Sequence, residues 1–186
     1  MKKIFLLILI ITGATTYSIA QDKIFTKTGI ITFDATASLE KVVAINKKAT
    51  CIVNTTTGQM EFAVLMKGFE FEKALMEEHF NENYVESDKF PKSTFKGKID
   101  ILSQVNFTKD GTYPVTLSGD LTIHGEIRAV TASGSFTVKN GIISGKSEFN
   151  ILLSDYKISI PSVVKETLSN EVKISVDVTL DPLIQR

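Results

Sequence analysis

The sequence predicts an all-β domain of about eight antiparallel strands. Apolar and polar residues alternate along most of the chain, turn-forming residues separate the alternating runs, and one short segment alone has helical spacing. The alternation is clearest in residues 172–180, where Val172, Ile174, Val176, Val178 and Leu180 are apolar and every residue between them is polar. A period of two places the apolar side chains on one face of a strand. We therefore expect each strand to have one dry face and one solvated face.

The first 20 residues are typical of a secretory signal peptide. Lys2 and Lys3 precede an apolar run at residues 4–11, and the small residues Ser18 and Ala20 occupy the positions that a signal peptidase reads. The apolar run is too short to cross a bilayer as a helix. We predict cleavage after Ala20, export to the periplasm or the medium, and a mature domain of residues 21–186 that does not insert into the membrane.

The predicted strands follow one another within a single domain. They cover residues 27–35, 42–53, 58–68, 93–105, 112–124, 127–138, 142–154 and 171–181. Asn140-Gly141 and Asp110-Gly111 predict hairpin turns, because both pairs tolerate positive φ. Four further glycines are expected at bulges or bends of a curved sheet: Gly119, Gly125, Gly134 and Gly145.

Residues 69–84 break the alternation. Phe69, Met76 and Phe80 recur at helical spacing among acidic residues, which predicts a short amphipathic helix. Residues 162–170 form a second stretch without a strand pattern. Two roles stay open for the three apolar side chains of the helix: they close one end of the sheet as a lid, or they only dock the helix.

The composition excludes several classes of function. The chain has 186 residues, with 21 Lys and Arg against 21 Asp and Glu, so it carries no formal net charge. Neither this balance nor the distribution of basic residues favours a nucleic-acid partner. One cysteine and two histidines offer little for a disulfide framework, a metal site or a cofactor. We expect none of these.

A sheet of eight strands without covering helices has two usual architectures. It folds into two packed sheets, or it closes into a barrel that removes its edges. An eight-stranded barrel is either filled by side chains or holds one small ligand. The alternation alone also permits an outer-membrane barrel with its apolar face turned to lipid, although the absence of Trp and of an aromatic C-terminus disfavours it.

The middle of the chain resembles the YceI-like family. The most specific motifs are residues 89–97 (KFPKSTFKG) and 119–125 (GDLTIHG), followed by residues 155–161 (DYKISIP) in the order that the family shows. The resemblance covers about residues 29–180. It implies a lipocalin-like barrel of eight antiparallel strands, whose apolar lumen takes an isoprenoid or another long-chain lipid. The chain departs from the family pattern at residues 127–130 (IRAV) and ahead of the first strand, where residues 26–33 (TKTGIITF) lack the His-Ser pair common in the family. Because the second departure could alter contacts to a polar headgroup, the identity of the ligand stays open.

The function implied by this resemblance is binding and not turnover. We expect an exported protein that sequesters or carries an isoprenoid, a quinone or a fatty-acid-like amphiphile. Tails of about 15 to 20 carbons would gain on the order of 12–16 kcal/mol from leaving water. The candidate wall residues are Phe33, Phe62, Val64, Phe95, Ile99, Leu121, Ile123, Phe149, Ile151 and Ile158, and each of them is equally compatible with ordinary core packing. A homodimer is possible through strand edges at an imperfect barrel seam.

Catalytic patterns are weak. Ser93 and Lys96 match a Ser-x-x-Lys motif, but they open a predicted strand, whereas that chemistry uses a helical turn. His124 lies on the polar face of its predicted strand and is expected to be a solvated surface residue. Cys51 has no thiol partner in the sequence. We therefore predict no catalytic site, and a hydrolase or a solid β-domain that binds other proteins remains the alternative.

Overall fold

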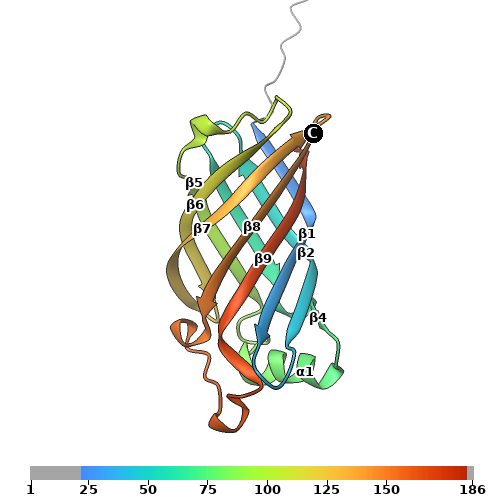
Figure 1. The fold of residues 1–186 in the computed structure, drawn as a ribbon, viewed down its shortest axis with the longest axis vertical. Coiled ribbons are helices and arrows are strands. Elements are labelled where there is room, and N and C mark those ends of the chain that lie inside the picture. Colours follow the sequence, from blue (N-terminus) through green and yellow to red (C-terminus); the bar gives the residue numbers. More distant parts are fainter. Residues whose placement is uncertain (1–21, 184–186) are drawn as a thin grey trace, which may run out of the picture.

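The computed structural model describes residues 22–183 and shows a closed β-barrel (Figure 1). Eight long strands form it: β1 (Lys23–Thr36), β2 (Val43–Asn54), β3 (Gln59–Leu65), β5 (Lys92–Ile99), β6 (Gly111–Ile123), β7 (Glu126–Lys139), β8 (Ile142–Leu152) and β9 (Leu168–Pro182). Their order is β1-β9-β8-β7-β6-β5-β3-β2, every pair is antiparallel, and β1 closes the barrel against β2. The predicted eight-stranded barrel is confirmed, and the two-sheet alternative is wrong.

The barrel closes because β1 pairs with strands on both sides, although the β1–β9 ladder is interrupted between Phe25 and Ile30. The possible homodimer stays a prediction. A ninth strand, β4 (Phe69–Phe71), has three residues and pairs with β2. The predicted signal peptide lies outside the described residues. No helix within residues 22–183 is long and apolar enough to span a membrane.

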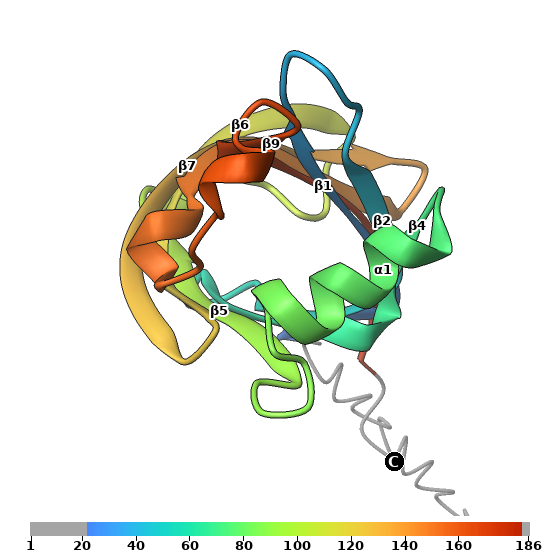
Figure 2. The ribbon, with the colours of Figure 1, turned by 90° about the horizontal axis from the view of Figure 1, so that it is seen from below.

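Short helical elements lie mainly at one end of the barrel. After η1 (Met66–Gly68) and β4, the predicted helix is formed by α1 (Ala74–His79) and a π-helical turn, η2 (Phe80–Tyr84). The elements η4 (Leu153–Tyr156) and η5 (Ser162–Val164) belong to the same end, and η3 (Leu102–Gln104) belongs to the opposite end. From below, α1 and the segment around η4 flank the mouth of the barrel (Figure 2).

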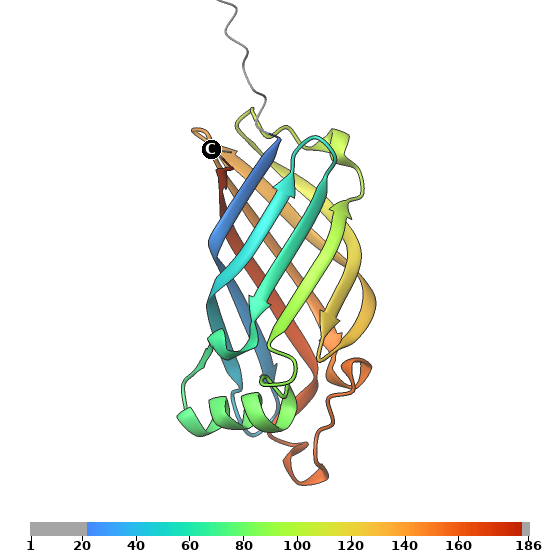
Figure 3. The same ribbon diagram turned by 180° about the vertical axis from the view of Figure 1, so that it is seen from behind.

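The two ends of the segment that carries α1 lie next to each other. The Met66 N–H donates to the Pro91 carbonyl at 3.0 Å, and Lys67 pairs with Asp88 at 2.6 Å. Residues 67–90 therefore leave the barrel wall and return to it at nearly the same place, and they form an insertion below the barrel (Figure 3).

One of the two predicted hairpin turns forms and the other does not. Asn140-Gly141 forms the β7–β8 turn with φ of 52° and 78°, as predicted. Asp110-Gly111 forms no hairpin: β5 ends at Ile99, η3 follows, and the Asp110 carboxylate accepts the Asn140 N–H at 3.1 Å. The second tight turn is His124-Gly125, with φ of 52° and 77°, and it joins β6 to β7.

The apolar positions of the alternating pattern point into the barrel, where they form two clusters. The lower cluster, near α1, includes Ile31, Phe69, Phe80 and Tyr156. The upper cluster, near η3, includes Val53, Ile99, Phe136 and Leu180. The protein therefore has one continuous wall around two different interiors.

Candidate functional site

The lower half of the barrel encloses an apolar cavity. About 1020 Å³ of empty space lies between its wall atoms, part of it open to solvent, and the centres of water molecules can occupy about 140 Å³ of it. One buried water needs only about 10–15 Å³ by the latter measure. The cavity is therefore large enough for several non-hydrogen atoms of a ligand.

Most of the predicted wall residues lie on this cavity. Nine of the ten candidates line it: Phe33, Phe62, Val64, Phe95, Leu121, Ile123, Phe149, Ile151 and Ile158. Ile99 faces the barrel interior but does not line this cavity. It is 3% exposed and packs in the upper cluster, because it lies two inward positions beyond Phe95 on β5, where the lumen is filled.

Sequence reasoning missed part of the wall. The cavity is also lined by Ile31, Met66, Val85, Leu117, Val130, Ala132, Leu153, Ile174 and Val176. Ile174 and Val176 belong to the most regular alternation in the sequence, so periodicity would have found them. Val85 comes from the irregular segment after η2 and carried no such signal.

Two serine side chains on the cavity wall have partners within the protein. The Ser93 hydroxyl donates to the Met66 sulfur at 3.0 Å, and the Ser147 hydroxyl donates to the Ser133 carbonyl at 2.8 Å. A ligand group that needs hydrogen bonds would lose water here without replacement, which is costly. The chemistry of the wall fits a hydrocarbon tail.

A second cavity, the vestibule, lies between the first one and α1. Phe33, Phe80, Val85, Leu153 and Ile158 line both spaces. The vestibule is more polar, because the Glu40, His79 and Thr167 side chains also line it. A tail in the lumen can therefore be joined to a polar group at the vestibule.

The three predicted lid residues have different positions. Phe80 and Phe69 line the inner cavity, whereas Met76 lines the vestibule. Phe80 is at the centre of an aromatic group, with ring centroids 5.8 Å from Phe33, 5.6 Å from Phe69 and 5.0 Å from Phe71. These contacts attach the segment of α1 to the wall strands β1 and β4.

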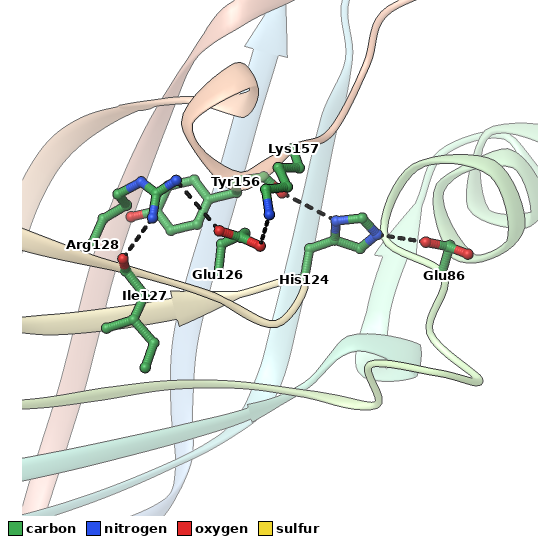
Figure 4. A network of polar contacts seen from close by, with 7 residues as sticks. All are labelled: Glu86, His124, Glu126, Ile127, Arg128, Tyr156 and Lys157. Atoms are coloured by element: carbon green, nitrogen blue, oxygen red, sulfur yellow. Dashed lines mark hydrogen bonds and ion pairs between the residues drawn. The ribbon is translucent and has the colours of Figure 1, made fainter.

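A polar network joins three segments at the rim of the mouth (Figure 4). His124 Nε2 lies 2.7 Å from a Glu86 carboxylate oxygen, and His124 Nδ1 lies 3.1 Å from the Tyr156 carbonyl oxygen. In addition, Lys157 Nζ lies 2.7 Å from Glu126. We call these five residues the clasp. It ties the end of the α1 insertion to the β6–β7 turn and to η4.

The clasp corrects the prediction for His124. Its side chain is 12% exposed and is not solvated, because the β6–β7 turn directs it between Glu86 and Tyr156. Both ring nitrogens face acceptors, so the doubly protonated ring would donate to both. The hydrogen bond from His124 lowers the pKa of Glu86, and the one from Lys157 lowers the pKa of Glu126.

Backbone strain is concentrated in the clasp. Non-glycine residues with positive φ number four among residues 22–183, and three are clasp residues: Glu86 (44°), His124 (52°) and Lys157 (57°). The left-handed conformation costs about 1–2 kcal/mol per such residue. Strain of this kind is often found at functional sites.

Other reactive groups are inaccessible or dispersed. Cys51 is 1% exposed in the upper cluster, and burial raises the pKa of its thiol to about 12. In the described part of the chain, no three His, Cys, Asp or Glu side chains gather to hold a metal ion.

Several solved structures share this fold at low sequence identity. A polyisoprenoid-binding domain from Saccharophagus degradans, implicated in plant cell wall breakdown, has a TM-score of 0.76 and 11% identity, and covers 88% of this chain and 99% of its own. BcnA of Burkholderia cenocepacia has a TM-score of 0.68 and 13% identity over 82% of this chain and 96% of its own. A YCEI protein of Campylobacter jejuni has a TM-score of 0.57 and 16% identity over 74% and 81%.

The family can be assigned from the sequence as well. No curated protein matches the chain significantly. The sequence pattern of the YceI-like domain family matches residues 17–180, which is most of the chain. The fold and this match together show that the chain belongs to the YceI-like domain family.

Proposed function

We propose that this protein binds the hydrocarbon tail of an amphiphilic lipid in the lower half of its barrel. The observation that carries the proposal is a cavity with a largely apolar wall, on which the Ser93 and Ser147 hydroxyls are already bonded within the protein. Burial of a tail in such a space is favourable by about 0.8 kcal/mol per CH₂ group. The polyisoprenoid-binding domain with the same fold supports a lipid-type ligand.

The direction of binding follows from the two ends of the lumen. The upper end is filled by the cluster around Phe136, whereas the lower end leads into the vestibule. A tail therefore enters from the α1 end, and the headgroup stays near Glu40, His79 and Thr167. This arrangement sequesters or carries a lipid and requires no bond to be made or broken.

Filling the cavity tests the proposal. Ala132 on β7 points into the cavity, so Ala132→Phe places a ring where the tail would lie. Ala129 on the same strand is exposed, and Ala129→Phe is the matched control. We expect Ala132→Phe to weaken the binding of a fluorescent fatty acid at least about tenfold, because the ring displaces two or more methylene groups. Unchanged binding in a folded Ala132→Phe protein would contradict the proposal.

We also propose that the protein acts outside the cytoplasm. The support is the signal-peptide pattern of residues 1–20, with its basic start, its apolar run and Ala20 before the expected cleavage site. Fractionation of the native host, followed by mass measurement of the intact protein, tests this. We expect a mature chain that begins at Gln21 in the envelope or the medium, and an uncleaved cytoplasmic chain would refute it.

A further inference from the structure

Two phenylalanines form the floor of the lipid cavity. Phe62 on β3 and Phe95 on β5 are paired across the two strands, and their ring centroids are 6.4 Å apart in an edge-to-face arrangement. Both line the lower cavity, and both also pack against the upper cluster. They therefore lie at the boundary between the hollow and the filled halves of the barrel.

Glycines on the neighbouring wall make room for the floor. A Cβ atom on Gly97 would lie 2.4 Å from the Phe95 ring, so that ring covers the next inward position of its own strand. Gly119 is the partner of Gly97 on β6, and a Cβ there would lie 2.4 Å from the Gly97 Cα. Because Gly97 and Gly119 carry no side chains, the Phe95 ring has room to lie across the lumen, where it would block the path of a tail.

A small space lies on the far side of the floor. The centres of water molecules can occupy about 20 Å³ of it, and it is lined by Cys51, Met60, Phe136 and their neighbours in the upper cluster. Phe62, Leu117 and Val176 line both this space and the lower cavity. Phe62 therefore lies on the boundary between the two spaces, and it is the bulkiest of the residues that line both.

The distance from the mouth to the floor gives the length of the tail. Along β8 and into the first residue of η4, the inward positions run from Ser147, which borders both spaces, to Leu153 at the vestibule. Six residues at about 3.3 Å each, on strands tilted by about 40°, correspond to about 15 Å along the barrel axis. An extended chain advances about 1.2 Å per single bond, so about twelve carbons fit.

We infer that the Phe62–Phe95 pair sets the length of the tail that this protein accepts. The ligand class is then a single-chain amphiphile that inserts about twelve carbons, and not a polyisoprenoid that runs through the whole barrel. The inference rests on the proposed lipid-binding function and gives it a size limit.

A series of saturated fatty acids from C8 to C18 tests the limit, each used below its micelle concentration and measured by displacement of a fluorescent probe. For the wild type, we expect the dissociation constant to fall about fourfold per added carbon up to about C12 and then to stop falling. In Phe62→Ala the two spaces merge, and the fall should continue for about four more carbons, since one further inward position adds about 5 Å.

Two other variants keep the test decisive. Phe95→Leu should also raise the chain length at which affinity stops rising. It replaces Phe62→Ala in the test if Phe62→Ala does not fold. Phe107→Ala is the matched control: this ring packs on Phe136 at 5.3 Å, lines neither space, and should leave the limit unchanged.

The possible failures are distinguishable. Affinity that rises steadily to C18 in the wild type would overturn the length limit, and an unchanged limit in folded Phe62→Ala and Phe95→Leu proteins would overturn the role of the pair. In both cases the lipid-binding function would stand. Binding of no fatty acid by the wild type or the variants would overturn that function and this inference with it.

Discussion

The two halves of the barrel share the same strands but differ in what fills them. In the upper half, long side chains such as Met60, Ile99 and Phe136 meet at the axis. In the lower half, the wall contributes Ala35, Ala44 and Ala49 to its cluster, whereas no alanine occurs in the upper cluster. These three alanines do not line the cavity, whose wall consists largely of Phe, Ile, Leu and Val side chains that leave its centre empty. One fold thus combines a conventional core, which supplies stability, with a cavity.

The largest difference between the halves should appear in unfolding. Phe136→Ala removes a ring from a filled core and is expected to cost about 3–5 kcal/mol. Phe149→Ala, on the adjacent strand β8, removes a ring that already faces empty space, so only the transfer from water is lost, about 1.5–3 kcal/mol. Urea unfolding of both variants measures the difference, and equal losses would mean that the halves are packed alike.

Thiol labelling compares access to the two interiors. The Cys51 thiol is buried in the upper cluster with a pKa of about 12, so at pH 8 its thiolate population should be about a thousandfold below that of an exposed cysteine. A cysteine placed in the lower cavity by Val64→Cys, in a Cys51→Ala background, should react much faster through the mouth. Absorbance with a small disulfide reagent follows both rates. Rapid labelling of Cys51 in the folded protein would show that the upper half opens.

Ligand release should depend on the insertion that carries α1. Phe80→Ala removes the central ring of the group formed with Phe33, Phe69 and Phe71, and we expect the release of a bound fatty acid to accelerate on the order of tenfold, because an aromatic pair contributes about 0.5–1.5 kcal/mol beyond its buried area. Stopped-flow displacement measures this rate. The control Leu75→Ala changes an exposed residue of α1 and should release ligand at the wild-type rate.

The smallest effect concerns pH and the clasp. Because the pKa of Glu86 is lowered in the folded protein, its ionised form stabilises the fold above its ordinary pKa, and this contribution is lost as the pH falls through the lowered value. The unfolding midpoint should therefore fall less between about pH 5 and pH 3 in Glu86→Gln than in the wild type. Asp34, Glu126 and Glu148 also have lowered pKa values and form the shared background. Glu82→Gln, at an exposed site, is the control and should follow the wild type.

The sequence was sufficient for the barrel and for most of the cavity wall. A period of two fixes which residues face inward, and the family resemblance supplied closure, so nine of the ten candidate wall residues were placed on the cavity. Periodicity has no information about depth along the axis, which is why Ile99 was assigned to the cavity although it lies in the filled half.

The clasp could not be predicted because it depends on contacts between distant segments. His124 bonds to residues 38 and 32 positions away, and its direction depends on a turn with two positive φ values. The sequence signal was present in the His124-Gly125 pair, since glycine favours such a turn, but strand alternation extended through His124 and concealed it. The turn signal of His124-Gly125 therefore predicts the position of the His124 side chain better than the end of the alternating run does.

The closed base of the α1 insertion has a consequence for the family. Since the Met66–Pro91 bond joins the two ends of residues 67–90, the chain leaves and re-enters the barrel wall at one place, and this piece contributes only the short β4 ladder to the sheet. Evolution can exchange it for a longer, shorter or differently charged piece without altering how the long strands pair. The insertion supplies His79 to the vestibule, whereas the Phe62–Phe95 pair lies on the long strands, so this contribution to the headgroup end can change while the floor is retained.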